Sequence, residues 1–517
     1  MNAQATNRPP PPRSRPRPTR FLTLATLATL PTLPTLGALA VLAAAPGCFS
    51  ARSSSGGGET TPPAPTRLIR TSDIELPDGY VIEVVATGLN FPTGVTFDDA
   101  GQVYVTESGY SYGEVFTTPR LLRVEPGGRT TVVATGKNPP WTGVTWADGA
   151  FIVAEGGVTE GGRIVRIAPG GQTQTLVAGL PSFGDHHTNG PVVGPDGFIY
   201  FGQGTATNSG IVGEDNYKFG WLKRHPEFHD VPCKDVTMTG AALTTSNPLT
   251  PRDKDDKATT GAFVPFGTQT QKGQVIPGKV PCSGAVMRVP VRGGTLNLVA
   301  WGFRNPFGLA FSPDGKLFVT DNGYDDRGSR PVWGNADYLW AVTPGAWYGW
   351  PDFADGRPVA QDRYAPPGGP TPPALLETPP NRPPQPVALF AVHSSSNGID
   401  ISRDPSFGHV GDAFVAQFGD QAPDVGKVLH PVGFKVVRVD LKTGVIRDFA
   451  VNRGKDNGPA SHLKAGGLER PISVRFDRAG QSLYVVDFGV MLMDERGARP
   501  KQGTGALFRI TRAASAG

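Results

Sequence analysis

RNPFGLAFSPDGKLFVTDNG, residues 304–323, decides the fold, because it shows in full a unit that recurs along the chain. A small or polar start leads into an alternating apolar strand, an Asp-Gly turn and a second apolar strand. Related stretches occupy residues 91–109, 141–157, 186–204, 396–420 and 470–489. Six copies of one pattern predict a single supersecondary unit that is repeated six times.

Further strands follow each copy. LLRVEPGG (121–128) and KVVRVDLKTG (435–444) are third strands, and TTVVATG (130–136) is a fourth. Four antiparallel strands per unit, six times over, predict an all-β six-bladed β-propeller. ALFRI (506–510) has no fourth strand after it, whereas YVIEVVATGL (80–89) precedes the first copy. We therefore expect this N-terminal strand to close the last blade and hide the sheet edges. An open sandwich, the alternative, leaves the six copies unexplained.

The composition agrees with a β fold. The 517 residues include 68 glycines and 52 prolines, which helix interiors tolerate poorly, and only 18% are charged. Of the formal net charge of +4, five arginines lie in residues 1–47, which contain no acid. The rest of the chain is close to neutral and has no basic stripe, so we expect no nucleic-acid partner.

The N-terminus has the layout of an export signal. An arginine- and proline-rich head precedes the apolar residues 21–45, and Ala45-Pro46-Gly47-Cys48 resembles a bacterial lipobox. We expect residues 1–47 to be a lipoprotein-type signal peptide and Cys48 to carry the lipid. The alternative is that residues 21–45 stay as a membrane anchor. Residues 48–70 are rich in Ser, Gly, Thr and Pro and are expected to be a flexible tether.

This layout predicts an exported protein. It is either lipid-anchored to the bacterial cell envelope, in the periplasm or at the outer membrane, or secreted. Its membrane contact is expected through the N-terminal lipid only.

The spacing of the copies locates insertions in the propeller, which we place at residues 71–514. The first three copies start 45 to 50 residues apart, but the third and fourth start 118 apart. Residues 205–283 are therefore expected to form an inserted subregion. The proline-rich residues 365–386 are expected to form an extended surface loop. Long loops on one face of a propeller often shape a binding site.

Cys233 and Cys282 both lie in the insertion. In an exported chain such a pair is expected to oxidise and to staple the insertion as a disulfide. A zinc site is the weaker alternative, because the spacing matches no ligand motif. The sequence holds no C-x-x-C-H motif for covalent haem.

Residues just before each first strand should converge on the mouth of the central channel. The chemically active ones are Asp185, His186, His187, Asn189, Arg304, Asn305, His393, Glu469 and Arg470. An Asp beside a His can orient the imidazole, and such a His can take a proton at neutral pH. Since a slip of one residue exchanges His186 and His187, the sequence leaves the choice between them open. The alternative is that these residues only cap strands and line a solvated channel.

A second candidate site follows the second strand of the fourth copy. Asp321-Asn322-Gly323-Tyr324-Asp325-Asp326 is followed by Asn335-Ala336-Asp337. Clustered carboxylates and amides around a turn-forming glycine suit an oxygen-liganded cation, and Ca²⁺ is the ion we expect. Alternatively, residues 325–327 form an exposed turn.

Several of these motifs resemble a known family. His186-His187-Thr188-Asn189, followed by GPDG at 194–197, resembles a stretch of bacterial glucose/sorbosone dehydrogenases. RNPFGL at 304–309 is similar to their RNP-x-G-L motif. The loop that begins at Asp321, together with WYGWP at 347–351, is similar to their calcium loop and YGWP turn. The resemblance covers about residues 74–512.

The resemblance implies a six-bladed propeller that oxidises aldoses or related aldehydes with pyrroloquinoline quinone (PQQ) and Ca²⁺. By that likeness His186 is the general base and Asp185 orients it. The implied cofactor contacts are Arg304, Asn305, Asn189 and Arg470. The implied calcium ligands or neighbours are Asp321, Gly323, Tyr324, Asp337 and Tyr348.

The chain departs from the family where cations are usual. Phe418-Gly419-Asp420 stands in place of a lysine segment, Arg470 and Ile472 in place of paired arginines, and Asn189 in place of an arginine. Burying the carboxylates of PQQ without cations is costly. Lys218, Lys223 and Arg224 of the insertion are the candidate replacements.

The sequence thus predicts an exported, PQQ- and calcium-dependent oxidoreductase. Its substrate is an aldose or related sugar aldehyde, hydride passes to the quinone, and electrons leave to a separate acceptor. The main alternative is a non-catalytic, lipid-anchored propeller that binds glycan or protein. Metal-assisted lactone hydrolysis is a third reading, for which the strand starts offer no even ring of ligands.

Overall fold

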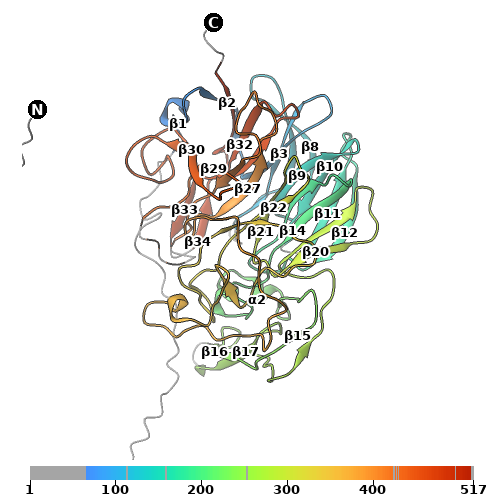
Figure 1. Ribbon diagram of the computed structural model, residues 1–517, viewed down its shortest axis with the longest axis vertical. Coiled ribbons are helices and arrows are strands. Elements are labelled where there is room, and N and C mark those ends of the chain that lie inside the picture. Colours follow the sequence, from blue (N-terminus) through green and yellow to red (C-terminus); the bar gives the residue numbers. More distant parts are fainter. Residues whose placement is uncertain are drawn as a thin grey trace, which may run out of the picture. The chain divides into compact units, whose positions relative to one another are not determined.

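Six antiparallel sheets of four or five strands dominate the computed structural model (Figure 1). The structure describes residues 66–111, 115–157, 160–251, 254–422, 426, 428, 430–494 and 497–513. The predicted signal peptide, the predicted lipidation site Cys48 and most of the predicted tether lie outside these residues. No helix in these ranges is long and apolar enough to cross a membrane.

Each blade has four strands that follow one another across the sheet. The first strands are β3 (Pro92–Phe97), β9 (Trp141–Ala147), β13 (Thr188–Val193), β21 (Pro306–Phe311), β27 (Ser396–Ile401) and β31 (Pro471–Phe476). The second strands are β4 (Val103–Glu107), β10 (Ala150–Glu155), β14 (Phe198–Gln203), β22 (Leu317–Asp321), β28 (Ala413–Gln417) and β32 (Ser482–Asp487). The third strands are β7 (Arg120–Val124), β11 (Gly162–Ile167), β19 (Ala285–Pro290), β23 (Tyr338–Ala341), β29 (Lys435–Val439) and β35 (Gly505–Arg512). The fourth strands are β8 (Thr130–Thr135), β12 (Thr173–Leu180), β20 (Asn297–Trp301), β26 (Ala388–Leu389), β30 (Ile446–Asn452) and β2 (Tyr80–Leu89).

The sheets stand in a closed circle. Their first strands contact one another in the order β3, β9, β13, β21, β27 and β31, and β31 contacts β3 again. The predicted six-bladed propeller is therefore confirmed.

Small residues let the first strands approach closely at the axis. A Cβ on Gly143 of β9 would lie 1.8 Å from the carbonyl oxygen of Gly190 in β13. A Cβ on Gly308 of β21 would lie 2.3 Å from the carbonyl oxygen of Asn397 in β27. Both distances are far below van der Waals contact, so a glycine at these positions is a packing requirement of the ring.

The N-terminal strand closes the circle. The last sheet has the order β2-β35-β32-β31, and β2 pairs with β35 from Tyr80 opposite Arg512 to Leu89 opposite Gly505. The predicted closing strand, residues 80–89, coincides with β2. The outermost strand of the sixth blade thus precedes all the other blades in the chain.

The second strand of every blade ends in a residue with a carboxylate or amide side chain, which we call its end-cap. These residues are Glu107, Glu155, Gln203, Asp321, Gln417 and Asp487. Several of these side chains accept hydrogen bonds from the segment that leads into the first strand. Asp487 accepts the backbone N–H groups of Glu469 and Arg470, and Glu107 accepts that of Asn90. The caps therefore fix the channel-facing segments to their own blade.

The insertion between β14 and β19 contains short elements. They are α1 (Glu214–Lys218), α2 (Trp221–Arg224), β15 (Val236–Thr237), β16 (Ala242–Ser246), β17 (Lys257–Gly261) and β18 (Val275–Ile276). At the start of α1, the side chain of Asn216 accepts the backbone N–H of Gly213 at 2.9 Å. Two acids in its first turn and a lysine in its last suit the helix dipole.

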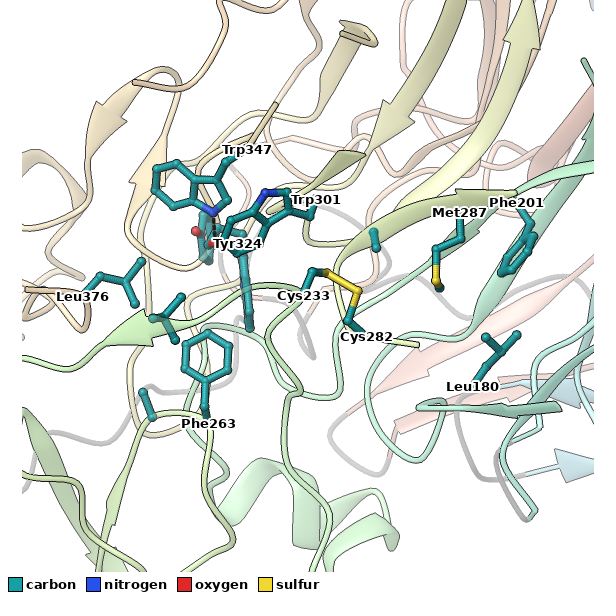
Figure 2. Close-up of a cluster of buried hydrophobic side chains, with 14 of the residues drawn as sticks. Leu180, Phe201, Cys233, Phe263, Cys282, Met287, Trp301, Tyr324, Trp347 and Leu376 are labelled. Carbon is teal, nitrogen blue, oxygen red and sulfur yellow. Dashed lines mark hydrogen bonds between the residues drawn. A yellow bond between two sulfur atoms is a disulfide. The ribbon is translucent and has the colours of Figure 1, made fainter. Parts of the chain in front are cut away.

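A hydrophobic core joins the insertion to the second, third and fourth blades (Figure 2). The sulfurs of Cys233 and Cys282 form a disulfide inside it. Trp301 of β20 and Trp347 lie beside the disulfide, and Phe263 approaches from the insertion. The insertion is thus packed against the propeller through a shared hydrophobic core.

The proline-rich loop differs in part from its prediction. Residues 365–386 contain no helix or strand, but Leu375 and Leu376 are buried at 1% and 4% exposure. Asp352 accepts both of their backbone N–H groups. The loop is therefore not simply a surface loop, because its two leucines complete the core under the insertion.

The remaining elements are short. β1 (Ile74–Glu75) adds a fifth strand beside β30, after the 3₁₀ turn η1 (Thr71–Asp73). The other small pieces are β5 (Tyr110–Ser111) with β6 (Val115–Phe116), β24 (Phe353–Ala354) with β25 (Arg357–Pro358), η3 (Asp362–Tyr364), and β33 (Met491–Asp494) with β34 (Gly497–Pro500).

Arg67 fastens the N-terminal segment to the sixth blade. Its side chain is 3% exposed, and Nη2 lies 3.1 Å from Oδ2 of the fully buried Asp487. The guanidinium also donates to the carbonyl oxygens of Thr504 and Gly467. Arg67 therefore balances a carboxylate that is buried at the end of β32.

Glu469 gives this part of the fold a pH dependence. Burial, together with the like charge of Asp487, raises the pKa of Glu469 to about 7 from 4.5, while Arg67 opposes the shift. Because this pKa is raised in the folded protein, the contribution of Glu469 to the free energy of unfolding is fully present below pH 4.5 and is lost as the pH rises through about 7.

We expect Glu469→Gln to raise the free energy of unfolding at pH 8 by about 2 kcal/mol and to change it little at pH 4. Urea unfolding at both pH values measures this difference. An equal effect at the two pH values would contradict the assignment.

Candidate active site

A cavity opens on the propeller axis at the end where the first strands begin. Its empty volume is about 690 Å³. All six blades line it, through Thr93, Ser108, Pro140, Thr142, Asp185, His186, His187, Asn189, Asn305, Phe307, Asn322, Ser395, Asn397, Phe418, Gln421, Ile472, Phe488 and Met491. The predicted convergence of the strand starts is therefore present.

His186 is held in one orientation. It is 3% exposed, and its Nδ1 lies 3.0 Å from the carbonyl oxygen of Thr205 and 3.1 Å from its hydroxyl. When Nδ1–H donates to that carbonyl, Nε2 is the nitrogen that accepts a proton. Burial, followed by the guanidiniums of Arg304 and Arg327, lowers the pKa of His186 well below its ordinary value. The imidazole is therefore neutral at physiological pH, as a base must be.

His187 also lines the cavity and is partly exposed. Burial lowers its pKa to about 4. The structure thus brings both predicted histidines to the cavity.

Asp185 makes contacts other than the one predicted for it. Its Oδ2 accepts Nη2 of Arg327 at 2.6 Å, and its Oδ1 accepts the side-chain amide of Asn216 at 3.3 Å. Burial raises its pKa to about 6 against the opposing effect of Arg327. The Nδ1 atom of His186 contacts Thr205, and the described contacts of Asp185 are with Arg327 and Asn216.

A row of hydrogen-bonded amide side chains lies along the cavity wall and links three blades. Asn189 donates to Oδ1 of Asn305 at 2.8 Å, and Asn305 donates to Oδ1 of Asn322 at 2.8 Å. Asn322 in turn donates to the carbonyl oxygen of Ser396 at 3.0 Å. Asn189 and Asn305, both predicted from the sequence, are thus joined in one wall.

The two predicted arginines lie behind the cavity lining. Arg304 donates from Nη2 to Asp325 at 2.8 Å and from Nε to the carbonyl of Asn208 at 3.0 Å. Arg470 is fully buried, donates to the carbonyls of Phe418 and Gly419, and lies under the Phe418 ring. Neither is among the residues that line the cavity.

The predicted calcium loop is held by protein hydrogen bonds. Asp321, the end-cap of β22, accepts the backbone N–H groups of Arg304 and Asn305, and burial raises its pKa to about 7. Asp337 accepts the N–H groups of Gly323 and Ser396, and burial raises its pKa to about 6.

The two predicted tyrosines are also engaged. Tyr348 donates its hydroxyl to the carbonyl of Ala341 and stacks on Phe303. Tyr324 donates its hydroxyl to the carbonyl of Phe353. Within the described ranges no group of three or more His, Cys, Asp or Glu residues could hold a metal ion. In this arrangement the predicted side chains do not fit Ca²⁺, and the calcium prediction depends on the loop carbonyls of Gly323 and Tyr324.

Three residues of the site were not found from the sequence. Thr205 orients His186, Asn208 holds Arg304, and Arg327 binds Asp185. Residues 325–327 are buried, at 6%, 6% and 9% exposure, so they are not an exposed turn. Thr205, Asn208 and Arg327 belong to no recognisable sequence motif, because each contacts a residue that is distant in sequence.

The lining fits one part of PQQ and not another. The lining includes amides that can donate to quinone oxygens. It also includes an aromatic wall of Phe307, Phe418 and Phe488, with Met491, which suits a planar ring. No Lys or Arg occurs among the lining residues that the structure describes, whereas PQQ carries three carboxylates. Lys218, Lys223 and Arg224, the candidate replacements, are exposed and do not line the cavity.

No protein-family model matches the chain, and no curated protein matches it. Solved structures do match. The holo PQQ domain of pyranose dehydrogenase from Coprinopsis cinerea has 15% identity and a TM-score of 0.50, over 90% of this chain and 100% of that one. A glucose dehydrogenase has 16% identity and a TM-score of 0.50, over 84% of this chain and 100% of that one. PQQ-bound aldose sugar dehydrogenase from Streptomyces coelicolor has 18% identity and a TM-score of 0.47, over 84% and 99%. At these identities the two matches with a TM-score of 0.50 establish the shared propeller fold and no more.

Proposed function

We propose that the chain is an oxidoreductase that oxidises an aldose or a related sugar aldehyde, with His186 as the general base. The observation that carries this proposal is a buried, neutral imidazole at the axial cavity, oriented by Thr205. The sugar dehydrogenases that share the fold support the choice of substrate class.

The proton transfer follows from the tautomer of His186. Nδ1–H donates to the Thr205 carbonyl, so Nε2 takes the proton of the sugar C1 hydroxyl. The Thr205 carbonyl then stabilises the imidazolium that forms. Because the cavity is lined by amides and hydroxyls, an uncharged sugar finds hydrogen-bond partners there without leaving a buried charge unpaired.

PQQ is the cofactor we propose, and when bound it supplies the acceptor for the hydride. Asn189, Asn305 and Asn322 would hold its quinone oxygens, and Phe418 would cover its ring. The described lining offers no cation for its carboxylates. Ca²⁺ is proposed with it, on the loop carbonyls of Gly323 and Tyr324.

The place of the reaction is also a proposal. Cys48 would carry a lipid after cleavage of residues 1–47, and the protein would act in the cell envelope or outside the cell. Electrons would leave through a separate acceptor, since the sequence has no C-x-x-C-H haem motif.

The experiment adds PQQ and Ca²⁺, together and singly, to the purified apo-protein and follows dye reduction with a panel of aldoses. We expect reduction that requires PQQ and a sugar, and that Ca²⁺ increases. If neither the absorbance of bound quinone nor dye reduction appears, the enzyme proposal fails and a glycan- or protein-binding propeller takes its place.

Because the described lining contains no Lys or Arg, a cation introduced at position 472 is predicted to tighten PQQ binding. The Ile472 side chain lines the cavity and is 6% exposed. We expect Ile472→Lys to tighten PQQ binding about tenfold or more, because a charge-assisted hydrogen bond contributes about 1.5–3 kcal/mol. Ile472→Met, which adds length without charge, is the matched control. Equal affinities of the two variants, measured by quinone absorbance titration, would refute the charge argument.

A further inference from the structure

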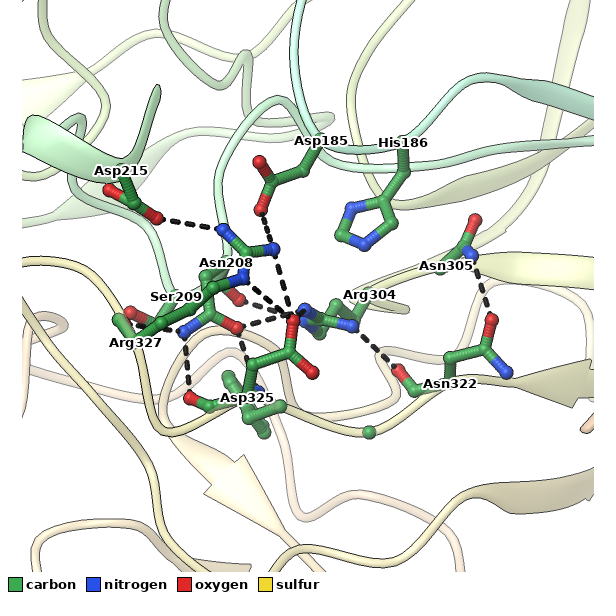
Figure 3. A network of polar contacts seen from close by, with 12 residues as sticks. Asp185, His186, Asn208, Ser209, Asp215, Arg304, Asn305, Asn322, Asp325 and Arg327 are labelled. Carbon is green, nitrogen blue, oxygen red and sulfur yellow. Dashed lines mark hydrogen bonds and ion pairs between the residues drawn. The ribbon is translucent and has the colours of Figure 1, made fainter. Parts of the chain in front are cut away.

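A cluster of five buried charges lies beside His186 (Figure 3). It contains two guanidiniums, from Arg304 and Arg327, and three carboxylates, from Asp185, Asp215 and Asp325. None of the five side chains is more than 10% exposed. Buried charges at this density persist only when each is paired.

Arg327 contacts all three carboxylates. Its Nη2 donates to Asp185 at 2.6 Å, its Nη1 to Asp215 at 2.8 Å and its Nε to Asp325 at 3.0 Å. The guanidinium also lies 5.4 Å from the centre of the Phe219 ring. Its planar fork of donors makes three such contacts at fixed angles, which a lysine ammonium cannot reproduce.

The three carboxylates come from different parts of the fold. Asp185 precedes β13 and is adjacent to His186, Asp215 lies in α1 of the insertion, and Asp325 lies in the loop after β22. Arg327 therefore joins the third blade, the insertion and the fourth blade at one point.

We infer that Arg327 is a positioning residue for His186: through Asp185 it holds the segment before β13 at the cavity, and through Asp215 it ties the insertion to that segment. This inference rests on the proposed function for its catalytic meaning, but the placement of His186 is measurable without turnover.

The same cation also acts on His186 through its charge. The imidazole is faced by Arg304, Arg327, His187 and the carbonyl and hydroxyl of Thr205. Asp185 is its neighbour in the chain. The two guanidiniums lower the pKa of His186. A neutral residue at position 327 removes one of the two cations that lower the pKa of His186. Without Arg327 the pKa of the buried Asp185 rises further, so this carboxyl adds no negative charge beside the imidazole. The pKa of His186 should therefore rise.

The first measurement is an NMR titration of the histidines, with His186→Gln to assign the resonance. In Arg327→Gln we expect the pKa of His186 to rise by about one unit or more relative to the wild type. If turnover is found, the acid limb of kcat/KM moves to higher pH by the same amount, because more base is protonated at each pH.

The second measurement covers the case in which Arg327→Gln does not fold. In Arg327→Lys, which keeps the charge and loses the fork, we expect the amides of Asp185 and His186 to exchange hydrogen about tenfold faster. These amides donate to the carbonyls of Ala206 and Thr205 at 2.9 and 3.1 Å. Opening of the segment exposes both.

Arg330→Lys is the matched control. Arg330 is fully buried in the same loop, where it pairs with Asp352 at 2.7 Å and donates to the carbonyls of Pro373 and Pro351 instead of to Asp185. We expect this variant to lose stability without changing the pKa of His186 or the exchange of the two amides. Wild-type values in both Arg327 variants, or equal changes in Arg330→Lys, would overturn the inference. Absence of dye reduction with every sugar would count against the proposed function alone.

Discussion

Replacing His186 with alanine is expected to lower kcat by about 10²–10⁴-fold, the usual contribution of a general base. The imidazole is neutral, buried and oriented by Thr205, so it can take the substrate proton from a fixed position. PQQ should still bind, since the amide row and the aromatic wall are unchanged. Stopped-flow dye reduction gives kcat, and quinone absorbance gives binding.

His187→Ala is the matched control, because this neighbour also lines the cavity. We expect it to keep kcat within a few-fold of the wild type. A large loss in His187→Ala with an active His186→Ala would move the base to the neighbouring residue. Loss of quinone binding in His186→Ala would mean that the side chain holds the cofactor rather than the proton.

Replacing Arg67 with alanine is expected to lower the free energy of unfolding by about 3–5 kcal/mol, as breaking a buried ion pair does. Asp487 would remain fully buried beside Glu469 without its cation. Urea unfolding measures the change.

Arg70→Ala is the control for this second effect. Arg70 pairs with Asp73 on the surface, and their side chains are 51% and 22% exposed. Exposed pairs contribute at most about 1 kcal/mol. Equal losses in the two variants would show that Arg67 acts through general contacts of the N-terminal segment and not through its buried charge.

The fold could be predicted because its signal is repeated. The alternating strands and the spare strand at residues 80–89 required only a local pattern and a count of copies. The fourth strand of blade four, β26, escaped this reasoning, since it has two residues and follows a long irregular segment. The burial of Leu375 and Leu376 also escaped it, because the partner core comes from an insertion more than a hundred residues earlier.

The site was predictable only in its location. Their positions at or just before the start of a first strand bring His186, Asn189 and Asn305 to the axis, and topology alone determines that. The directions of Arg304 and Arg470 depend on which acceptors lie behind the lining, and those acceptors come from other blades. Thr205 and Arg327 were missed for the same reason.

The position of β35 between β2 and β32 has a consequence for biosynthesis. This strand is synthesised after both of its neighbours, and it must pair with β2, made much earlier, and with β32, made shortly before it. A nascent chain therefore cannot complete its circle until β35 has left the ribosome. A chain truncated before Gly505 would lose both of these pairings at once and would leave two bare strand edges, which proteases and chaperones can recognise.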